Sequence, residues 1–132
     1  MVEFTDYQKF VKGVMSQPSQ DNKALADRYF ELVEKYPNIN FPQLLTAGIG
    51  LPGEVGEVAD LVKKIFFQGK EPTPDVIAKI AAEAGDICWY LASLTMALGL
   101  DFNTILEDNI TKLESRYPGG KFDVQRSENR KN

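Results

Sequence analysis

Apolar residues recur at helical spacing along most of the chain, and no segment alternates apolar and polar residues as a half-buried strand does. Proline and glycine interrupt this pattern at intervals, so they mark where helices should end. The sequence therefore predicts an all-α fold, a bundle of four or five helices. The expected helices span about 5–16, 23–36, 40–67, 73–98 and 101–117.

The ends of these helices carry recognisable signals. Thr5, Asn40 and Asp101 are expected to cap the first, third and last helices, because their short polar side chains can accept from free backbone N–H groups. Gly99 is a typical C-terminal residue for the fourth helix. Pro52 falls inside the third helix, so we expect either a kink or a fresh helical start there.

The length of 132 residues can support one substantial hydrophobic core without disulfides or a structural metal. We expect a single domain over 1–122 and a polar, poorly ordered tail over 123–132. The chain has 15 Lys and Arg against 19 Asp and Glu, a formal net charge of −4. This mildly acidic balance argues against duplex nucleic acid as a partner.

Histidine is absent, and Cys88 is the single cysteine. The absence of histidine excludes Ser-His-Asp and Cys-His catalysis, His-ligated zinc and the usual di-iron carboxylate site. Because one cysteine cannot form an internal disulfide, a cytoplasmic location is expected, with Cys88 as a small buried hydrophobe. The first ten residues do not resemble a secretory signal.

The longest uncharged apolar stretch, 87–98, is too short to span a bilayer, so no membrane association is expected. It is apolar nearly all round, with Trp89 and Met96 lying off the main stripe. A helix buried on all sides in so small a protein predicts a subunit interface.

Two acid pairs, Glu54 with Glu57 and Glu83 with Asp86, lie on the two longest expected helices. Within each pair the spacing is i, i+3, which places both acids on one face of a helix. Each pair falls inside or beside the apolar stripe that should face the core. If the two helices pack antiparallel through those stripes, the four carboxylates converge.

Four ionised carboxylates in a partly dry site require a compensating positive charge. No histidine is available, and oxygen ligands select a hard cation such as Mg²⁺, with Mn²⁺ as a substitute. Magnesium held in this way usually binds substrate phosphates, which indicates nucleotide or pyrophosphate chemistry. The alternative is that these acids are solvated or lie at a rim, where they only aid solubility.

Three segments together resemble one enzyme family. They are LPGEVGEVADLVKK at 51–64, EAGDI at 83–87 and NITKLESRYPGGKF at 109–122. The chain is similar to the MazG-like nucleoside triphosphate pyrophosphohydrolases of the all-α NTP pyrophosphatase superfamily, which carry an ExxE pair followed by an ExxD pair. Its short single-domain form resembles versions encoded by bacteriophages, which implies a host cytoplasm as the location.

This resemblance implies a reaction and a cofactor. Glu54, Glu57, Glu83 and Asp86 would bind Mg²⁺ and act as the catalytic residues. A metal-activated water would attack the α-phosphorus of a nucleoside or deoxynucleoside triphosphate and release the monophosphate and pyrophosphate. Either Glu54 or Glu57 could accept the proton of that water. The resemblance also implies a homo-oligomer, either a dimer or a dimer-of-dimers tetramer.

The resemblance further implies substrate-binding residues: Tyr90 in the nucleotide pocket, and Asn109, Lys112 and Arg116 near phosphate. From pattern alone, Tyr90 is equally an aromatic of the core, and Lys112 with Arg116 is equally a solvated basic face. Two other functions stay open. One is a hydrolase of the same fold that acts on another phosphorylated nucleotide, such as an alarmone or a phosphoribosyl nucleotide. The other is a non-enzymatic helical interaction module.

Overall fold

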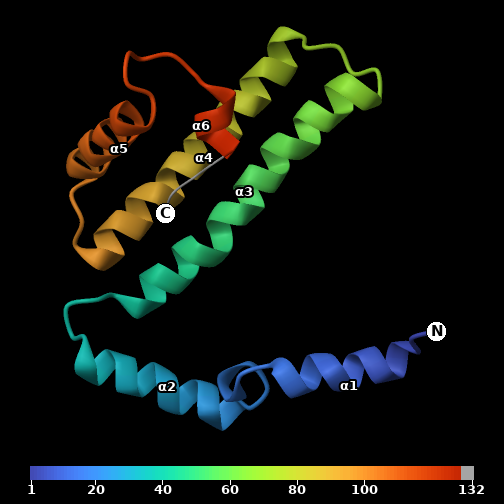
Figure 1. Ribbon diagram of the computed structural model, residues 1–132, viewed down its shortest axis with the longest axis vertical. Helices are drawn as coiled ribbons and strands as arrows, with labels where there is room; N and C mark the ends of the chain where they lie inside the picture. Colours follow the sequence, from blue (N-terminus) through green and yellow to red (C-terminus); the bar gives the residue numbers. More distant parts are fainter. Residues whose placement is uncertain (129–132) are drawn as a thin grey trace. The chain divides into compact units, whose positions relative to one another are not determined.

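The computed structural model describes residues 1–128, and these residues form helices joined by short connections (Figure 1). No strand occurs within that range, which confirms the all-α prediction. The elements are α1 (Phe4–Val14), the 3-10 helix η1 (Gln17–Ser19), α2 (Asn22–Lys35), α3 (Phe41–Phe67), α4 (Pro74–Leu98), α5 (Phe102–Arg116) and α6 (Val124–Glu128).

The chain divides into two compact units, the first over Met1–Phe41 and the second from Pro42 onward. In the first unit, η1 separates α1 from α2, and Asp21 caps α2 by accepting from the Ala24 backbone N–H at 2.7 Å. The second unit holds α3 to α6, including both acid pairs. A single domain over 1–122 and a poorly ordered tail remain predictions, and residues 129–132 lie outside the described residues.

The helix ends follow the expected signals in two of three clear cases. Asp101 caps α5, because its carboxylate accepts from the backbone N–H of Thr104 at 3.0 Å and from the hydroxyl of Thr104 at 2.9 Å. Gly99 ends α4 in the left-handed conformation, with a φ of 64°. The prediction that Thr5 caps α1 is wrong, because Asp6 and Tyr7 already donate to the Glu3 carbonyl and the helix begins at Phe4.

Helix α3 is continuous through Pro52, so the expectation of a fresh helical start there is wrong. Proline removes one backbone donor, and the hydrogen bonds of the flanking turns keep the helix intact. The consequence is that Glu54 and Glu57 share one uninterrupted helix with the small residues that precede them. Thus the position of this acid pair is tied to the packing of the N-terminal half of α3.

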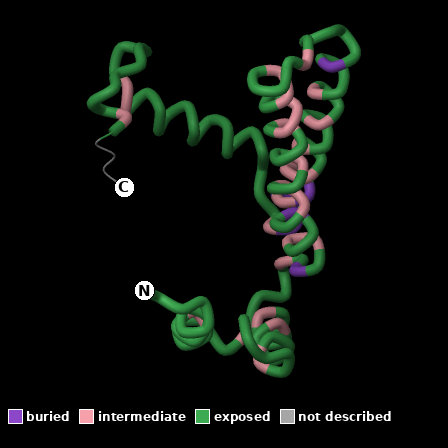
Figure 2. Tube along the Cα trace, turned by 90° about the vertical axis from the view of Figure 1, so that its right-hand side faces the viewer, coloured by how far each residue is buried: buried purple, intermediate pink, exposed green. Residues whose placement is uncertain are grey.

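Helices α3 and α4 lie side by side and run in opposite directions, connected by the segment 68–73 (Figure 1). The most buried residues of the pair are small: Ala47 on α3 is 1% exposed and Ala97 on α4 is 0% exposed. Ser93 and Thr95 are also buried, and the purple segments in Figure 2 follow this helix pair. Small side chains at these positions let the two backbones approach closely.

Several large apolar residues of α3 and α4 are exposed in the single chain. Val55 and Val62 on α3 are 49% and 40% exposed, and Trp89 and Met96 on α4 are 59% and 69% exposed. Within one chain α3 covers only one side of the 87–98 stretch, so burial of its other side at a subunit interface stays a prediction. Cys88 is exposed rather than buried for the same reason.

Two further features bear on what the chain can do. The short helix α6 was not expected from the sequence, and Asp123 stabilises its start by accepting from the Arg126 backbone N–H at 2.9 Å. Among the helices within residues 1–128, none combines the length and the apolar character that crossing a membrane requires.

Candidate metal centre

Three of the four predicted acids come together between α3 and α4. Glu54 on α3 and Glu83 and Asp86 on α4 each offer a carboxylate oxygen, and these three oxygens all lie within 4.8 Å of one another. Glu54 and Glu83 are half-buried, whereas Asp86 is exposed. The cluster therefore sits at the edge of the helix pair, where both solvent and an ion can reach it.

The fourth acid, Glu57, is not part of this close group. It lies one turn beyond Glu54 on α3, and its side chain is exposed. Its charge nevertheless acts on Glu83, and this effect is larger than that of Glu54 or Asp86. The structure thus separates the predicted acids into a group of three and a neighbouring carboxylate.

Electrostatics within the cluster are unfavourable in the ion-free chain. Partial desolvation raises the pKa of Glu83, and the negative charges of Glu57, Glu54 and Asp86 raise it further, together with a hydrogen bond from its carboxyl group to Glu54. That hydrogen bond requires one of the two carboxyl groups to hold a proton. A divalent cation would remove the need for this proton, because it neutralises the charges directly.

We expect the stability of the ion-free protein to depend on the titration of Glu83. Because its pKa is raised above the ordinary value of 4.5, the stability it contributes is present below that pH and is lost as the pH rises through the folded-state pKa. Urea unfolding in EDTA at a series of pH values measures this loss. The difference in unfolding free energy between the wild type and Glu83→Gln should change with pH, and a constant difference would contradict this prediction.

Nearby positive charges do not neutralise the cluster. Lys63 and Lys64 on α3 both pair with Asp60, at 2.7 Å and 2.5 Å, and these contacts lower the pKa of Asp60 to about 2. Within residues 1–128, no salt bridge joins a lysine or arginine to any of the four predicted acids. The donor set is oxygen only and carries unpaired negative charge, so it fits a hard divalent cation.

Tyr90 lies one helical turn after Asp86 on α4 and is half-buried. Its ring packs against the backbone of α3 at Gly50. The family resemblance pointed to Tyr90 but not to Gly50. A glycine inside a long helix is itself a signal of close packing, because glycine disfavours helix and is retained there when a neighbour occupies the space of its side chain.

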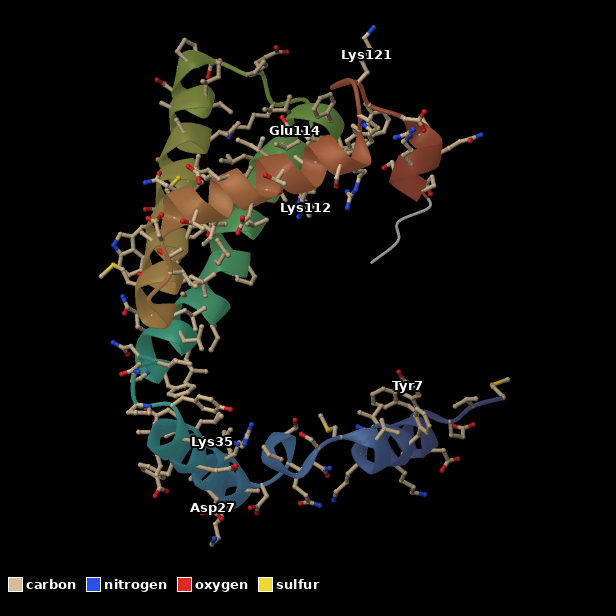
Figure 3. The ribbon with its side chains drawn as sticks, turned by 60° about the vertical axis from the view of Figure 1, so that its left-hand side comes forward. Tyr7, Asp27, Lys35, Lys112, Glu114 and Lys121 are labelled. Carbon is tan, nitrogen blue, oxygen red and sulfur yellow. The ribbon has the colours of Figure 1, made fainter. Side chains whose placement is uncertain are left out.

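The three residues expected near phosphate all lie on α5. Asn109 and Lys112 are exposed, and Arg116 is half-buried with its backbone carbonyl accepting from Arg126 at 3.4 Å. Lys112 and Glu114 leave opposite edges of the helix (Figure 3). In the part of the chain that the structure describes, no hydrogen bond or ion pair joins these three residues to the acid cluster.

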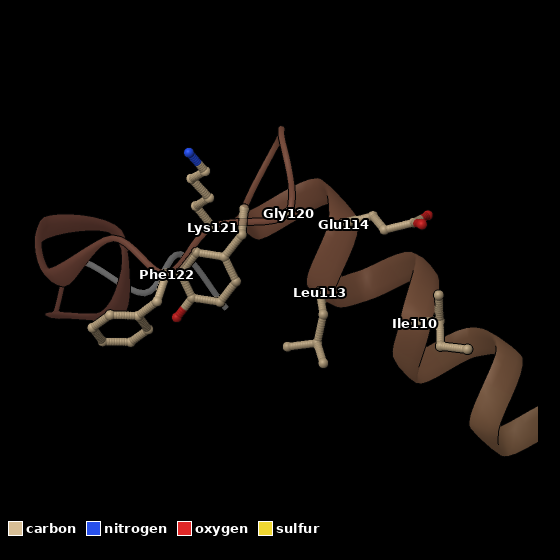
Figure 4. A pocket seen from close by; sticks show the side chains of 7 residues that line it. Ile110, Leu113, Glu114, Gly120, Lys121 and Phe122 are labelled. Carbon is tan, nitrogen blue, oxygen red and sulfur yellow. The ribbon is translucent and has the colours of Figure 1, made fainter.

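An open pocket of about 280 Å³ adjoins the C-terminal half of α5 (Figure 4). It is mainly apolar, and it is lined by none of the four predicted metal ligands and by none of the three residues expected near phosphate. The lining residues are Ile110, Leu113, Glu114, Tyr117, Gly120, Lys121 and Phe122.

An all-helical fold with an oxygen-donor cluster between two antiparallel helices fits the family that the sequence resembles, and the comparison with known families agrees. Residues 43–120, more than half of the chain, match the family described as the MazG nucleotide pyrophosphohydrolase domain. The chain belongs to this family, which confirms the resemblance found in the sequence. The matched region contains both acid pairs, Tyr90 and the three candidate residues of α5.

One similar curated protein is the Gene 37 protein of Mycobacterium phage L5. It is 39% identical over 74 residues, which correspond to 54% of this chain and 64% of the phage protein. The match therefore covers less than two thirds of that relative. No solved structure matches the chain.

Proposed function

We propose that this chain hydrolyses nucleoside or deoxynucleoside triphosphates to the monophosphate and pyrophosphate in a reaction that depends on Mg²⁺. Membership of the MazG family supports nucleotide pyrophosphohydrolase activity. The observation that carries the metal dependence is the meeting of Glu54, Glu83 and Asp86 within 4.8 Å, with no pairing cation among the described residues.

Glu54, Glu83 and Asp86 are the proposed ligands of Mg²⁺, for which Mn²⁺ is a possible substitute. When bound, the ion supplies a Lewis acid that neutralises triphosphate charge and lowers the pKa of water. Glu54 on α3 and Glu83 and Asp86 on α4 would hold the ion with ligands from two helices. This is more exact positioning than a loop would provide.

Glu57 is the proposed general base. It lies on the same helix as Glu54 but outside the group of three, so its carboxylate is available to accept a proton. In the proposed step, the oxygen of water bonds to the α-phosphorus and its proton passes to Glu57. The bond from the α-phosphorus to the bridging oxygen breaks, and pyrophosphate leaves with that oxygen.

Other groups complete the proposal. Tyr90 and Asn109 are proposed to contact the nucleotide, while Lys112 and Arg116 neutralise the leaving pyrophosphate.

A homo-oligomer, either a dimer or a tetramer, is proposed because Trp89 and other large apolar side chains are exposed in the single chain. The mycobacteriophage relative supports the cytoplasm of a host cell as the location.

A screen of all common NTPs and dNTPs, with and without Mg²⁺, tests the proposed reaction. Pyrophosphate and the matching monophosphate should form in equal amounts, and only when the ion is present. Release of inorganic phosphate alone, or turnover in EDTA, would contradict the proposal. If every triphosphate is inert, the same assay with an alarmone or a phosphoribosyl nucleotide tests the other hydrolase of this fold. If none of these nucleotides is hydrolysed, the result favours a non-enzymatic interaction module.

A further inference from the structure

The register of α3 against α4 follows from one contact. Gly50 faces Tyr90, and because the helices run in opposite directions, four residues forward on α3 corresponds to four residues back on α4. This register places Glu54 opposite Asp86, in agreement with the acid cluster. Applied along the pair, it also places Glu57 opposite Glu83 and Ala47 opposite Ser93.

The contact at Gly50 leaves no room for a side chain. A Cβ atom added there would overlap the ring atoms Cε1 and Cζ of Tyr90 and would lie 2.8 Å from Cδ1. Other glycines of α3 behave differently, since a Cβ at Gly48, Gly53 or Gly56 meets nothing within 4 Å. Gly50 is therefore the position on α3 where glycine is required by a neighbouring side chain.

The residues around this contact cannot easily compensate for a change in it. Ala47, one turn before Gly50, is 1% exposed, and Ser93, one turn after Tyr90, is 7% exposed. These side chains are too short to hold the helices at another distance. One turn further along, carboxylate oxygens of Glu54, Glu83 and Asp86 lie within 4.8 Å of one another, and this crowding of acids favours separation of the helices when no ion is bound.

We propose that Gly50 and Tyr90 form a spacer that fixes the separation and register of α3 and α4 next to the acid cluster. Gly50 is then a positioning residue for the metal centre. The Tyr90 ring packs against it, and Gly50 itself is not proposed to contact the ion or the substrate. The part of this inference that concerns the ion rests on the proposed function. The part that concerns helix packing does not.

Substitution of Gly50 by alanine tests the spacer, with Gly48→Ala as the matched control on the same helix. The probe is Mn²⁺ alone, without nucleotide, and its affinity is measured by electron paramagnetic resonance. Gly50→Ala should weaken Mn²⁺ binding at least about tenfold, the lower end of what misplaced ligand-supporting residues cost. Gly48→Ala should bind Mn²⁺ as the wild type does, because its Cβ meets open space.

Removing the Tyr90 ring should abolish the loss of Mn²⁺ affinity that Gly50→Ala causes. In a Tyr90→Ala background, adding Gly50→Ala should cause little further loss of Mn²⁺ affinity, because the clash no longer exists. Tyr90→Phe keeps the ring and should keep wild-type Mn²⁺ affinity. An equal loss from Gly50→Ala with and without the ring would overturn the proposal. If Gly50→Ala alone does not fold, a folded double variant supports the spacer, and an unfolded double variant overturns it.

The experiment separates failure of the spacer from failure of the proposed function. If the wild type binds no Mn²⁺, the proposed metal centre is wrong. Thermal unfolding of the wild type, Gly50→Ala, Tyr90→Ala and the double variant then tests the spacer by itself. The two substitutions should be strongly non-additive in melting temperature. Additive shifts in melting temperature would overturn the spacer whatever the result with the ion.

Discussion

Asp86→Asn is expected to lower Mg²⁺-dependent pyrophosphate release at least about a hundredfold, since loss of a ligand should exceed the roughly 10–100-fold cost of losing a supporting residue. The substitution keeps the size of the side chain and removes one charge from the group of three oxygens. Asp86 is exposed, so folding should be preserved. Steady-state release of pyrophosphate from the best triphosphate of the screen measures the effect, and circular dichroism checks the fold.

Glu57→Gln provides the contrast that identifies the base. Because Glu57 lies outside the close group, this variant should lose turnover to a similar degree but should still bind Mn²⁺. Asp86→Asn should lose both turnover and Mn²⁺ binding. Wild-type turnover in Asp86→Asn would remove it from the proposed ligands. Loss of Mn²⁺ binding in Glu57→Gln would show that Glu57 is a ligand rather than the base.

Magnesium is expected to stabilise the folded chain strongly. At a concentration of the ion about 100 times its dissociation constant, the free energy of unfolding should rise by about 2.7 kcal/mol, because the unfolded chain does not hold the three acids together. The physical origin is that the ion neutralises acids whose desolvation and mutual repulsion raise the pKa of Glu83. Urea unfolding at pH 7 in Mg²⁺ and in EDTA, with ionic strength matched by KCl, measures the difference.

The Asp86→Asn variant gives the control for this effect. It should be at least as stable as the wild type in EDTA, because one of the repelling charges is gone, and should gain little from Mg²⁺. Equal stabilisation of both proteins by the ion would mean that Mg²⁺ acts elsewhere on the chain. No stabilisation of the wild type would remove the metal centre from the proposal.

Most of the helices were predictable from local signals in the sequence. The apolar periodicity and the Asp101 and Gly99 signals gave the two long helices and the start of α5, because each signal depends only on neighbours in the sequence. The Thr5 cap failed because the backbone at Glu3 had already begun the helix. The exposure of Val55 and Trp89 has another reason: helical periodicity shows which face is apolar but not what covers it.

The candidate site was predictable in composition but less so in geometry. The i, i+3 spacing was enough to place Glu83 and Asp86 together on α4, and the antiparallel register brought Glu54 to them. Glu57 stays outside the close group of three although the register places it opposite Glu83, and the i, i+3 spacing does not specify this. The seating of Tyr90 on Gly50 depends on the distance between two backbones, so periodicity could not reveal it.

The pairing of Lys63 and Lys64 with Asp60 has a consequence for the order of binding in the proposed reaction. Both lysines are held by a third acid of α3, so the field at the cluster stays negative and repels a free triphosphate anion. The nucleotide should therefore enter as its complex with magnesium, or after the ion. Without a divalent cation, binding of the free triphosphate should become faster as salt is added, because salt screens the repulsion between like charges.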